Sequence, residues 1–136
     1  MKTGSNRDCG RVMAPKDCLL AELPLDADHH AVLRIIRFYL QSFCMPDSMA
    51  WMAALSEADD VFGTARGPQV AVRSLAYLQA VRRARRSAFD FNSPTCPTCA
   101  KIVTEHERRI IMALLCAGRG TEAQANVELM MLCEGN

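Results

Sequence analysis

Apolar residues recur at helical spacing along most of this chain, and this periodicity constrains the fold more than any other feature. The clearest stripe has spacings of three, one, three, one and three, over Val32, Ile35, Ile36, Tyr39, Leu40 and Phe43. Such spacing places the apolar side chains on one face of an amphipathic helix. No segment alternates polar and apolar residues over a useful length, so the sequence does not predict a sheet of any size.

The same pattern predicts about five helices, over residues 27–43, 48–58, 68–88, 100–117 and 121–133. Pro68 stands where the first turn of a helix often has proline. Gly118 is a typical helix stop, and Thr121 begins a sequence of capping-box form. The short link over residues 118–120 predicts that the last two helices form an antiparallel hairpin. We therefore expect an all-α fold, a compact bundle of about five helices that ends in this hairpin.

The length of 136 residues suits one domain, and half of the residues are hydrophobic, enough for a core of ordinary size. Glycine and proline interrupt residues 1–25, which we expect to form an N-terminal arm or extended segment. Residues 26–136 are expected to form a single helical domain. Residues 1–10 are polar, and no run approaches the roughly 20 apolar residues of a membrane span. These features favour a protein of the reducing cytoplasm without a membrane partner.

Two of the seven cysteines, Cys96 and Cys99, are separated by two residues in a CxxC turn. Such a turn directs both sulfurs to one side, where they can bind one tetrahedral zinc ion. The same turn at the start of a helix can instead form a redox-active dithiol. Two unrelated thiols in the core are the third interpretation, because cysteine is often buried.

A histidine favours the metal. His106 falls on the inward stripe predicted for the helix over residues 100–117, where a neutral imidazole needs a polar partner. The antiparallel hairpin should return Cys133 to the level of the CxxC turn, and His29 is the alternative fourth ligand. We therefore predict a structural zinc site of Cys96, Cys99 and His106, completed by Cys133 or His29.

Between residues 61 and 89 there are six arginines and no acidic residue, and four arginines fall close together: Arg82, Arg83, Arg85 and Arg86. A cluster of this kind can bind the phosphates of a nucleic acid. Cations at the C-terminus of a helix are also favoured by the helix dipole without any ligand. Both interpretations stay open at this stage.

The sequence shows no Ser-His-Asp set, glycine-rich phosphate loop or pair of catalytic carboxylates, which favours a protein that is not an enzyme. We expect a small regulatory or adaptor protein with a structural zinc ion, and nucleic acid as a candidate partner. Eight methionines and an apolar first helix also permit a protein partner or a homodimer. The alternative is a thiol–disulfide redox protein that uses the Cys96–Cys99 pair.

Overall fold

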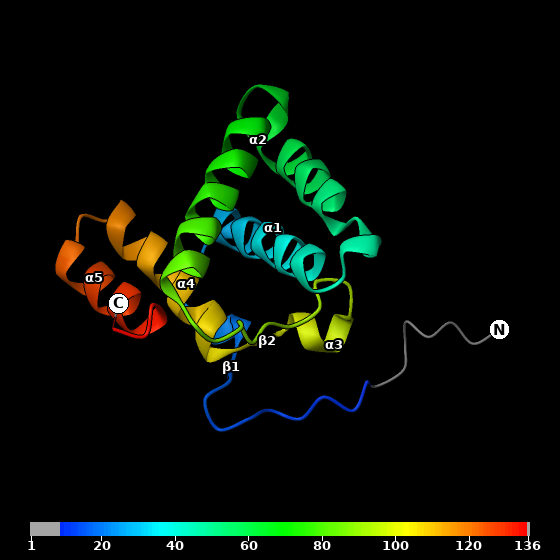
Figure 1. The fold of residues 1–136 in the computed structure, drawn as a ribbon. Helices are drawn as coiled ribbons and strands as arrows, with labels where there is room; N and C mark the ends of the chain where they lie inside the picture. The colour runs from blue at the N-terminus through cyan, green and yellow to red at the C-terminus, as the bar shows by residue number, and fades with distance from the viewer. Residues whose placement is uncertain (1–8, 136) are drawn as a thin grey trace.

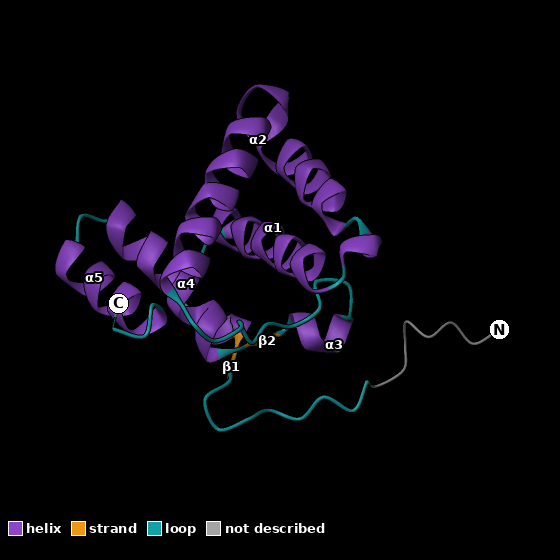
Figure 2. Ribbon diagram, in the orientation of Figure 1, coloured by secondary structure: helices purple, strands orange, loops and turns teal. Residues whose placement is uncertain are grey.

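Helices form most of the computed structural model, which describes residues 9–135 (Figures 1 and 2). They are α1 (Ala27–Cys44), α2 (Ala50–Ala84), α3 (Pro97–Ala100), α4 (Glu105–Gly118) and α5 (Glu122–Leu132). Two short strands, β1 (Cys18–Leu19) and β2 (Ile102–Val103), pair antiparallel, with Cys18 opposite Val103. The predicted all-α class and the closing hairpin, α4 with α5, are confirmed. Within the described residues no helix combines the length and the apolar character that crossing a membrane requires.

Helix α1 lies at the centre of the fold and follows its predicted pattern closely. The side chain of Asp26 caps its first turn by accepting a hydrogen bond from the backbone nitrogen of His29, at 2.9 Å. Its inward face is almost fully buried, and packs against α2 and α4. The apolar members of that face are Ala31, Leu33, Ile35, Ile36, Tyr39 and Leu40.

Helix α2 joins the two helices predicted over residues 48–58 and 68–88. The chain stays helical from residue 50 to 84 except at Gly63, whose φ of 82° and ψ of 165° turn the helix axis sharply. Figure 1 shows the two arms meeting at this apex. The arms approach closely beside it, since a Cβ atom on Gly67 would lie only 2.8 Å from the Cα atom of Asp59. The break between the two predicted helices is thus a one-residue kink at Gly63, and Pro68 lies inside the second arm.

The helix predicted over residues 100–117 begins five residues later, at Glu105, and that boundary was wrong. The reason is a capping box: Thr104 Oγ1 accepts from the backbone nitrogen of Glu107, and Glu107 Oε1 accepts from that of Thr104. Val103, predicted to be helical, pairs in β2 instead. The CxxC turn is therefore separated from α4 by a short helix, α3, and a strand.

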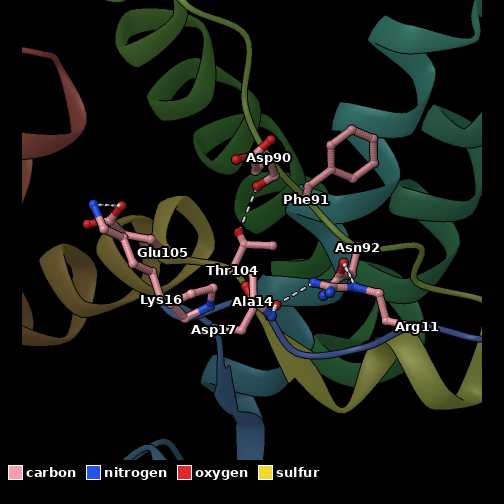
Figure 3. A pocket seen from close by; sticks show the side chains of 10 residues that line it. Arg11, Ala14, Lys16, Asp17, Asp90, Phe91, Asn92, Thr104 and Glu105 are labelled. Atoms are coloured by element: carbon pink, nitrogen blue, oxygen red, sulfur yellow. Dashed lines mark hydrogen bonds and ion pairs between the residues drawn. The ribbon is translucent and has the colours of Figure 1, made fainter.

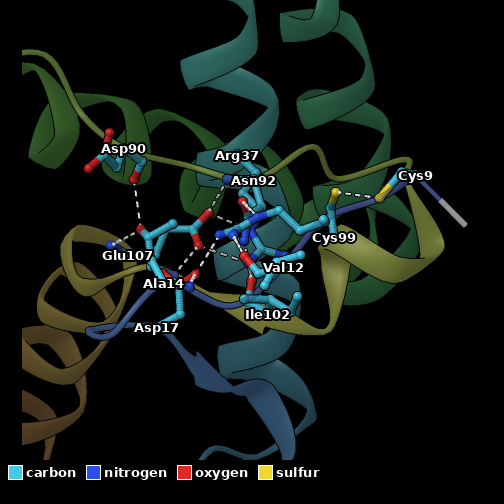
Figure 4. Close-up of polar contacts among 12 residues, drawn as sticks. Cys9, Val12, Ala14, Asp17, Arg37, Asp90, Asn92, Cys99, Ile102 and Glu107 are labelled. Atoms are coloured by element: carbon cyan, nitrogen blue, oxygen red, sulfur yellow. Dashed lines mark hydrogen bonds and ion pairs between the residues drawn. The ribbon is translucent and has the colours of Figure 1, made fainter.

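A buried ion pair connects α1 to the segments around that turn (Figure 4). Arg37 and Glu107 are 1% and 0% exposed, and their side chains form two hydrogen bonds, of 2.6 Å and 2.9 Å. Arg37 also donates to the carbonyl oxygens of Ala100 and Ile102, and Glu107 accepts from the backbone nitrogen of Asn92. Each charge is thus hydrogen-bonded on several sides, which offsets the loss of water.

Replacing Glu107 with glutamine should destabilise the fold by about 3–5 kcal/mol, because Arg37 would remain charged and buried without its counter-ion. The matched control is Glu57→Gln, which removes the charge of a part-exposed pair with Arg34. That change should cost less than about 1 kcal/mol. Urea denaturation of both variants measures the difference, and equal losses would contradict this role of the buried pair.

Candidate metal centre

Residues 9–25 of the predicted N-terminal arm are folded back along the body of the protein, and residues 1–8 lie outside the described part of the chain. The pairing of the arm with β2 is extended by a hydrogen bond from Leu20 N to Lys101 O, of 2.8 Å. A turn that includes a hydrogen bond from Asp17 N to Ala14 O reverses the chain before β1. Arg11 then fixes the preceding segment by donating from Nε to Asn92 Oδ1, at 3.2 Å. This path carries residue 9 to the CxxC turn.

Cys9, Cys96 and Cys99 therefore meet, with their three sulfur atoms all within 4.8 Å of one another. The Sγ atoms of Cys9 and Cys99 are 3.3 Å apart (Figure 4), and Cys96 Sγ accepts a hydrogen bond from the backbone nitrogen of Cys99, at 3.4 Å. Two thiolates on one tetrahedral zinc ion would lie about 3.8 Å apart, given a Zn–S bond of about 2.3 Å. The three thiols are close enough to bind one metal ion together.

The three thiols are not electrostatically equivalent. The hydrogen bond from the backbone of Cys99, followed by those from the thiols of Cys99 and Cys9, lowers the pKa of Cys96. Burial, and then hydrogen bonding to Cys96, raises the pKa of Cys99 to about 12. Because Cys99 holds its proton so strongly, a metal ion that binds here must displace that proton. Metal affinity should therefore increase with pH.

His106, the predicted third ligand, is directed elsewhere. Its Nδ1 accepts a hydrogen bond from the backbone nitrogen of Asp90, at 2.9 Å, and its ring meets Phe89 edge to face. That bond requires an unprotonated Nδ1, and the guanidinium group of Arg85 lies 3.4 Å from Nε2 on the other side of the ring. Burial and, secondly, the neighbouring Arg85 lower the pKa of His106. The histidine fastens the segment after α2 onto α4 and lies outside the group of thiols.

The two candidates for the fourth ligand also lie outside that group. Cys133 follows the last residue of α5 and packs against the main hydrophobic core. His29 lies in the first turn of α1, with Nδ1 2.7 Å from Asp26 Oδ1. Of the predicted set, the structure brings together only Cys96 and Cys99. Cys9 joins them from an arm whose path no local motif indicates.

A cavity of about 500 Å³ lies along the seam between the arm and the body (Figure 3). Within the arm, Arg11 contacts Asp17 at 2.7 Å. Across the seam, Lys16 lies 3.6 Å from Glu105 at the start of α4, and Arg11 donates to Asn92 in the segment after α2. These two contacts across the seam hold the arm against the body, and so help to position Cys9.

The arginine cluster at the end of α2 divides into two kinds of residue. Arg85 is buried, and donates hydrogen bonds to the carbonyl oxygens of Leu132, Ser87 and Ala88. It therefore has a structural role, joining the end of α2 to the end of α5. The other three arginines, Arg82, Arg83 and Arg86, are exposed.

Comparison of the chain with protein-family models, with curated proteins and with solved structures gives no match. The geometry of the residues themselves is therefore the basis for any functional assignment.

The lowered pKa of His106 gives a pH dependence of known sign. As pH falls through about 6.5, the unfolded chain gains a proton at this residue while the folded protein does not. The free energy of unfolding should therefore decrease when the pH is lowered from 7.5 to 5.5. Urea denaturation across this range tests it: His106→Gln should have a shallower slope than the parent protein, and His30→Gln, the control, should keep the parent slope. A parental slope in His106→Gln would contradict this assignment.

Proposed function

We propose that this protein is a small, non-enzymatic helical protein that holds a structural zinc ion through Cys9, Cys96 and Cys99. One observation carries the proposal, namely the convergence of three thiols from two distant parts of the chain. Thiolates are soft ligands that favour zinc, and tetrahedral zinc sites made largely of cysteine usually have a structural role. The fourth position of the ion would be taken by water or by an external ligand.

The proposed ion would connect the arm to the body. Cys9 and Cys99 are 90 residues apart in the sequence, so an ion shared by them closes a very long loop. Binding of this kind stabilises the folded state, because the separated ligands of the unfolded chain bind the ion less well. The site would therefore act on the position of residues 9–17, and through them on the surface that the arm covers.

A regulatory or adaptor role is supported by apolar side chains that face solvent near the start of α2. This exposed group comprises Met45, Met49, Trp51, Met52, Leu55 and Val61. Large exposed apolar side chains are common at sites of protein interaction, and methionine adapts to varied partners. We propose that this surface contacts a protein partner or a second copy of the chain.

Nucleic acid stays a second proposed partner, through Arg82, Arg83 and Arg86 rather than all four predicted arginines. Arg85 has its donors directed into the protein. The cytoplasmic location predicted from the sequence also stays a proposal, and is supported by the chemistry of the site: thiols bind zinc only while they are reduced.

A Cys9→Ser variant tests the zinc site most directly. The parent protein, purified without a metal-binding tag, should contain about one zinc ion per chain. Loss of one thiolate should weaken zinc affinity by at least about tenfold, since changes that affect a ligand only indirectly already reach that size. Cys44→Ser is the matched control, because Cys44 is exposed and lies outside the group of thiols. Elemental analysis and competition with a chelator give the two readouts.

The same variants separate a structural ion from one bound adventitiously. In the parent protein a chelator should lower the melting temperature and expose residues 9–17 to proteolysis. In Cys9→Ser both effects should be smaller, because the ion no longer joins the arm to the body. Equal zinc content and equal chelator effects in Cys9→Ser and Cys44→Ser would contradict the proposal.

The hydrogen bond from the backbone nitrogen of Cys99 to Cys96 Sγ, which lowers the pKa of Cys96, favours a second candidate, a thiol–disulfide redox protein. The thiolate of Cys96 would attack a low-molecular-weight disulfide and release one thiolate from it. Cys99 would then attack the resulting mixed disulfide and pass its proton to the departing sulfur, forming the Cys96–Cys99 bond and releasing the second small thiol. The protein pair loses two electrons and two protons, and the small disulfide is reduced to two thiols.

Redox titration against a small dithiol–disulfide couple distinguishes this candidate from the zinc site. A redox protein should be purified free of metal, and its Cys96–Cys99 pair should cycle reversibly between thiol and disulfide. A zinc protein should resist oxidation until the metal is removed. Mass spectrometry after alkylation identifies the paired cysteines, with Cys96→Ser as the variant that abolishes cycling.

A further inference from the structure

A second cavity lies between the ends of α1 and α2, and none of the three grouped thiols lines it. It has a volume of about 350 Å³, within the range of about 300–1,000 Å³ that small-molecule sites usually have. Three phenylalanines and three arginines line it: Phe43, Phe89, Phe91, Arg82, Arg85 and Arg86. This combination of aromatic walls and guanidinium groups determines which ligand chemistry would suit it.

The charge of the cavity is strongly positive, because none of the residues that line it is acidic. Arg82 donates to a neutral partner, Gln79 Oε1, at 2.7 Å. Among the described residues neither Arg82 nor Arg86 takes part in an ion pair. The nearby carboxylate of Glu134 lies outside the lining, and accepts hydrogen bonds from the backbone of Arg86 and from Ser87. Within residues 9–135, the charge of these two guanidinium groups is thus left to solvent or to a ligand.

The arginines are also held in place by the aromatic rings. The guanidinium carbon of Arg82 lies 3.8 Å from the centre of the Phe43 ring, and that of Arg85 lies 4.7 Å from the centre of the Phe89 ring. Such stacking fixes a long side chain before any ligand arrives, so that less conformational entropy is lost on binding. The buried Arg85 supports the wall, while Arg82 and Arg86 remain exposed for an anion.

We infer that this cavity binds a nucleotide unit, with its base against the aromatic lining and its phosphate on Arg82 and Arg86. Guanidinium groups bind phosphate oxygens through two parallel hydrogen bonds, and arginine planes and phenylalanine rings both stack with bases. The unit could be a free mononucleotide or one nucleotide of a single strand, which share this chemistry. The inference depends on the arginine part of the proposed function and is independent of the zinc site.

One arginine of the cluster does not line the cavity, and it provides a matched control. Arg83 is exposed beside Arg82 but does not line the cavity. Isothermal titration at low salt with adenosine 5′-monophosphate should show one site per chain. Arg82→Gln and Arg86→Gln should each weaken that binding by roughly tenfold, as expected for the loss of a charged hydrogen bond to phosphate, and Arg83→Gln should leave it unchanged. Helical dichroism checks that each variant is folded.

Further ligands test which chemical groups the cavity recognises, and whether the nucleotide is free or part of a strand. Adenosine and inorganic phosphate should each bind much more weakly than the mononucleotide, because each retains only half of the contacts. A short oligodeoxyadenylate that binds at one site and is displaced by the mononucleotide would identify a strand as the source. Binding of the mononucleotide alone would identify a free nucleotide. Cys96→Ser should retain nucleotide binding, so failure of the zinc proposal would not be mistaken for failure of this one.

Two results would overturn the inference. No binding of the mononucleotide at low salt is the first. The second is an equal loss of oligonucleotide binding in the Arg82, Arg83 and Arg86 variants without any mononucleotide site, which indicates a diffuse basic surface whose affinity depends on salt alone.

Discussion

The ion pair between Arg37 and Glu107 is the contact on which the arrangement of the other segments depends. Arg37 comes from the central helix, and its guanidinium group ends between the carbonyl oxygens of Ala100 and Ile102. Those oxygens belong to the short segment that follows the CxxC turn. Glu107 also caps α4, because the same carboxylate accepts a hydrogen bond from the backbone nitrogen of Thr104. A single pair of charges therefore sets where α4 begins and where the CxxC turn lies relative to α1. Its buried, several-fold hydrogen-bonded state explains how two charges are tolerated in a core.

Much of the helical architecture follows from sequence, since apolar periodicity and caps are local signals. The stripe from Val32 to Phe43 predicts α1 nearly to the residue, and Gly118 with Thr121 predicts the final hairpin. The predicted helix boundaries were wrong where one local signal in the sequence outweighed another. Thr104 and Glu107 form a capping box that the apolar stripe around Val103 concealed. Gly63 bends α2 through its positive φ, where a full loop was expected.

The site could be predicted only in part, for a different physical reason. Cys96 and Cys99 are recognisable because their spacing is local. Cys9 is brought to them by contacts that act over long distances in sequence, among them Arg11 with Asn92 and Leu20 with Lys101. None of these contacts produces a periodic pattern in the sequence. The helix boundary also separated His106 from the CxxC turn, because α3 and β2 lie between them, and its ring accepts a hydrogen bond from the backbone of Asp90 instead. Arg85 was assigned to a surface cluster because its contact with Leu132 joins residues 47 positions apart.

The path of the arm also has a consequence during synthesis of the protein. Both partners of Cys9 follow it in the chain by at least 87 residues, the separation of residues 9 and 96. At synthesis rates of 5–20 residues per second, that interval lasts about 4 to 17 seconds. During it, the helices between residues 27 and 84 can form and pack, while the thiol of Cys9 has neither neighbour within reach. The thiol of Cys9 in the nascent chain is therefore open to other thiol chemistry until the CxxC turn has been made.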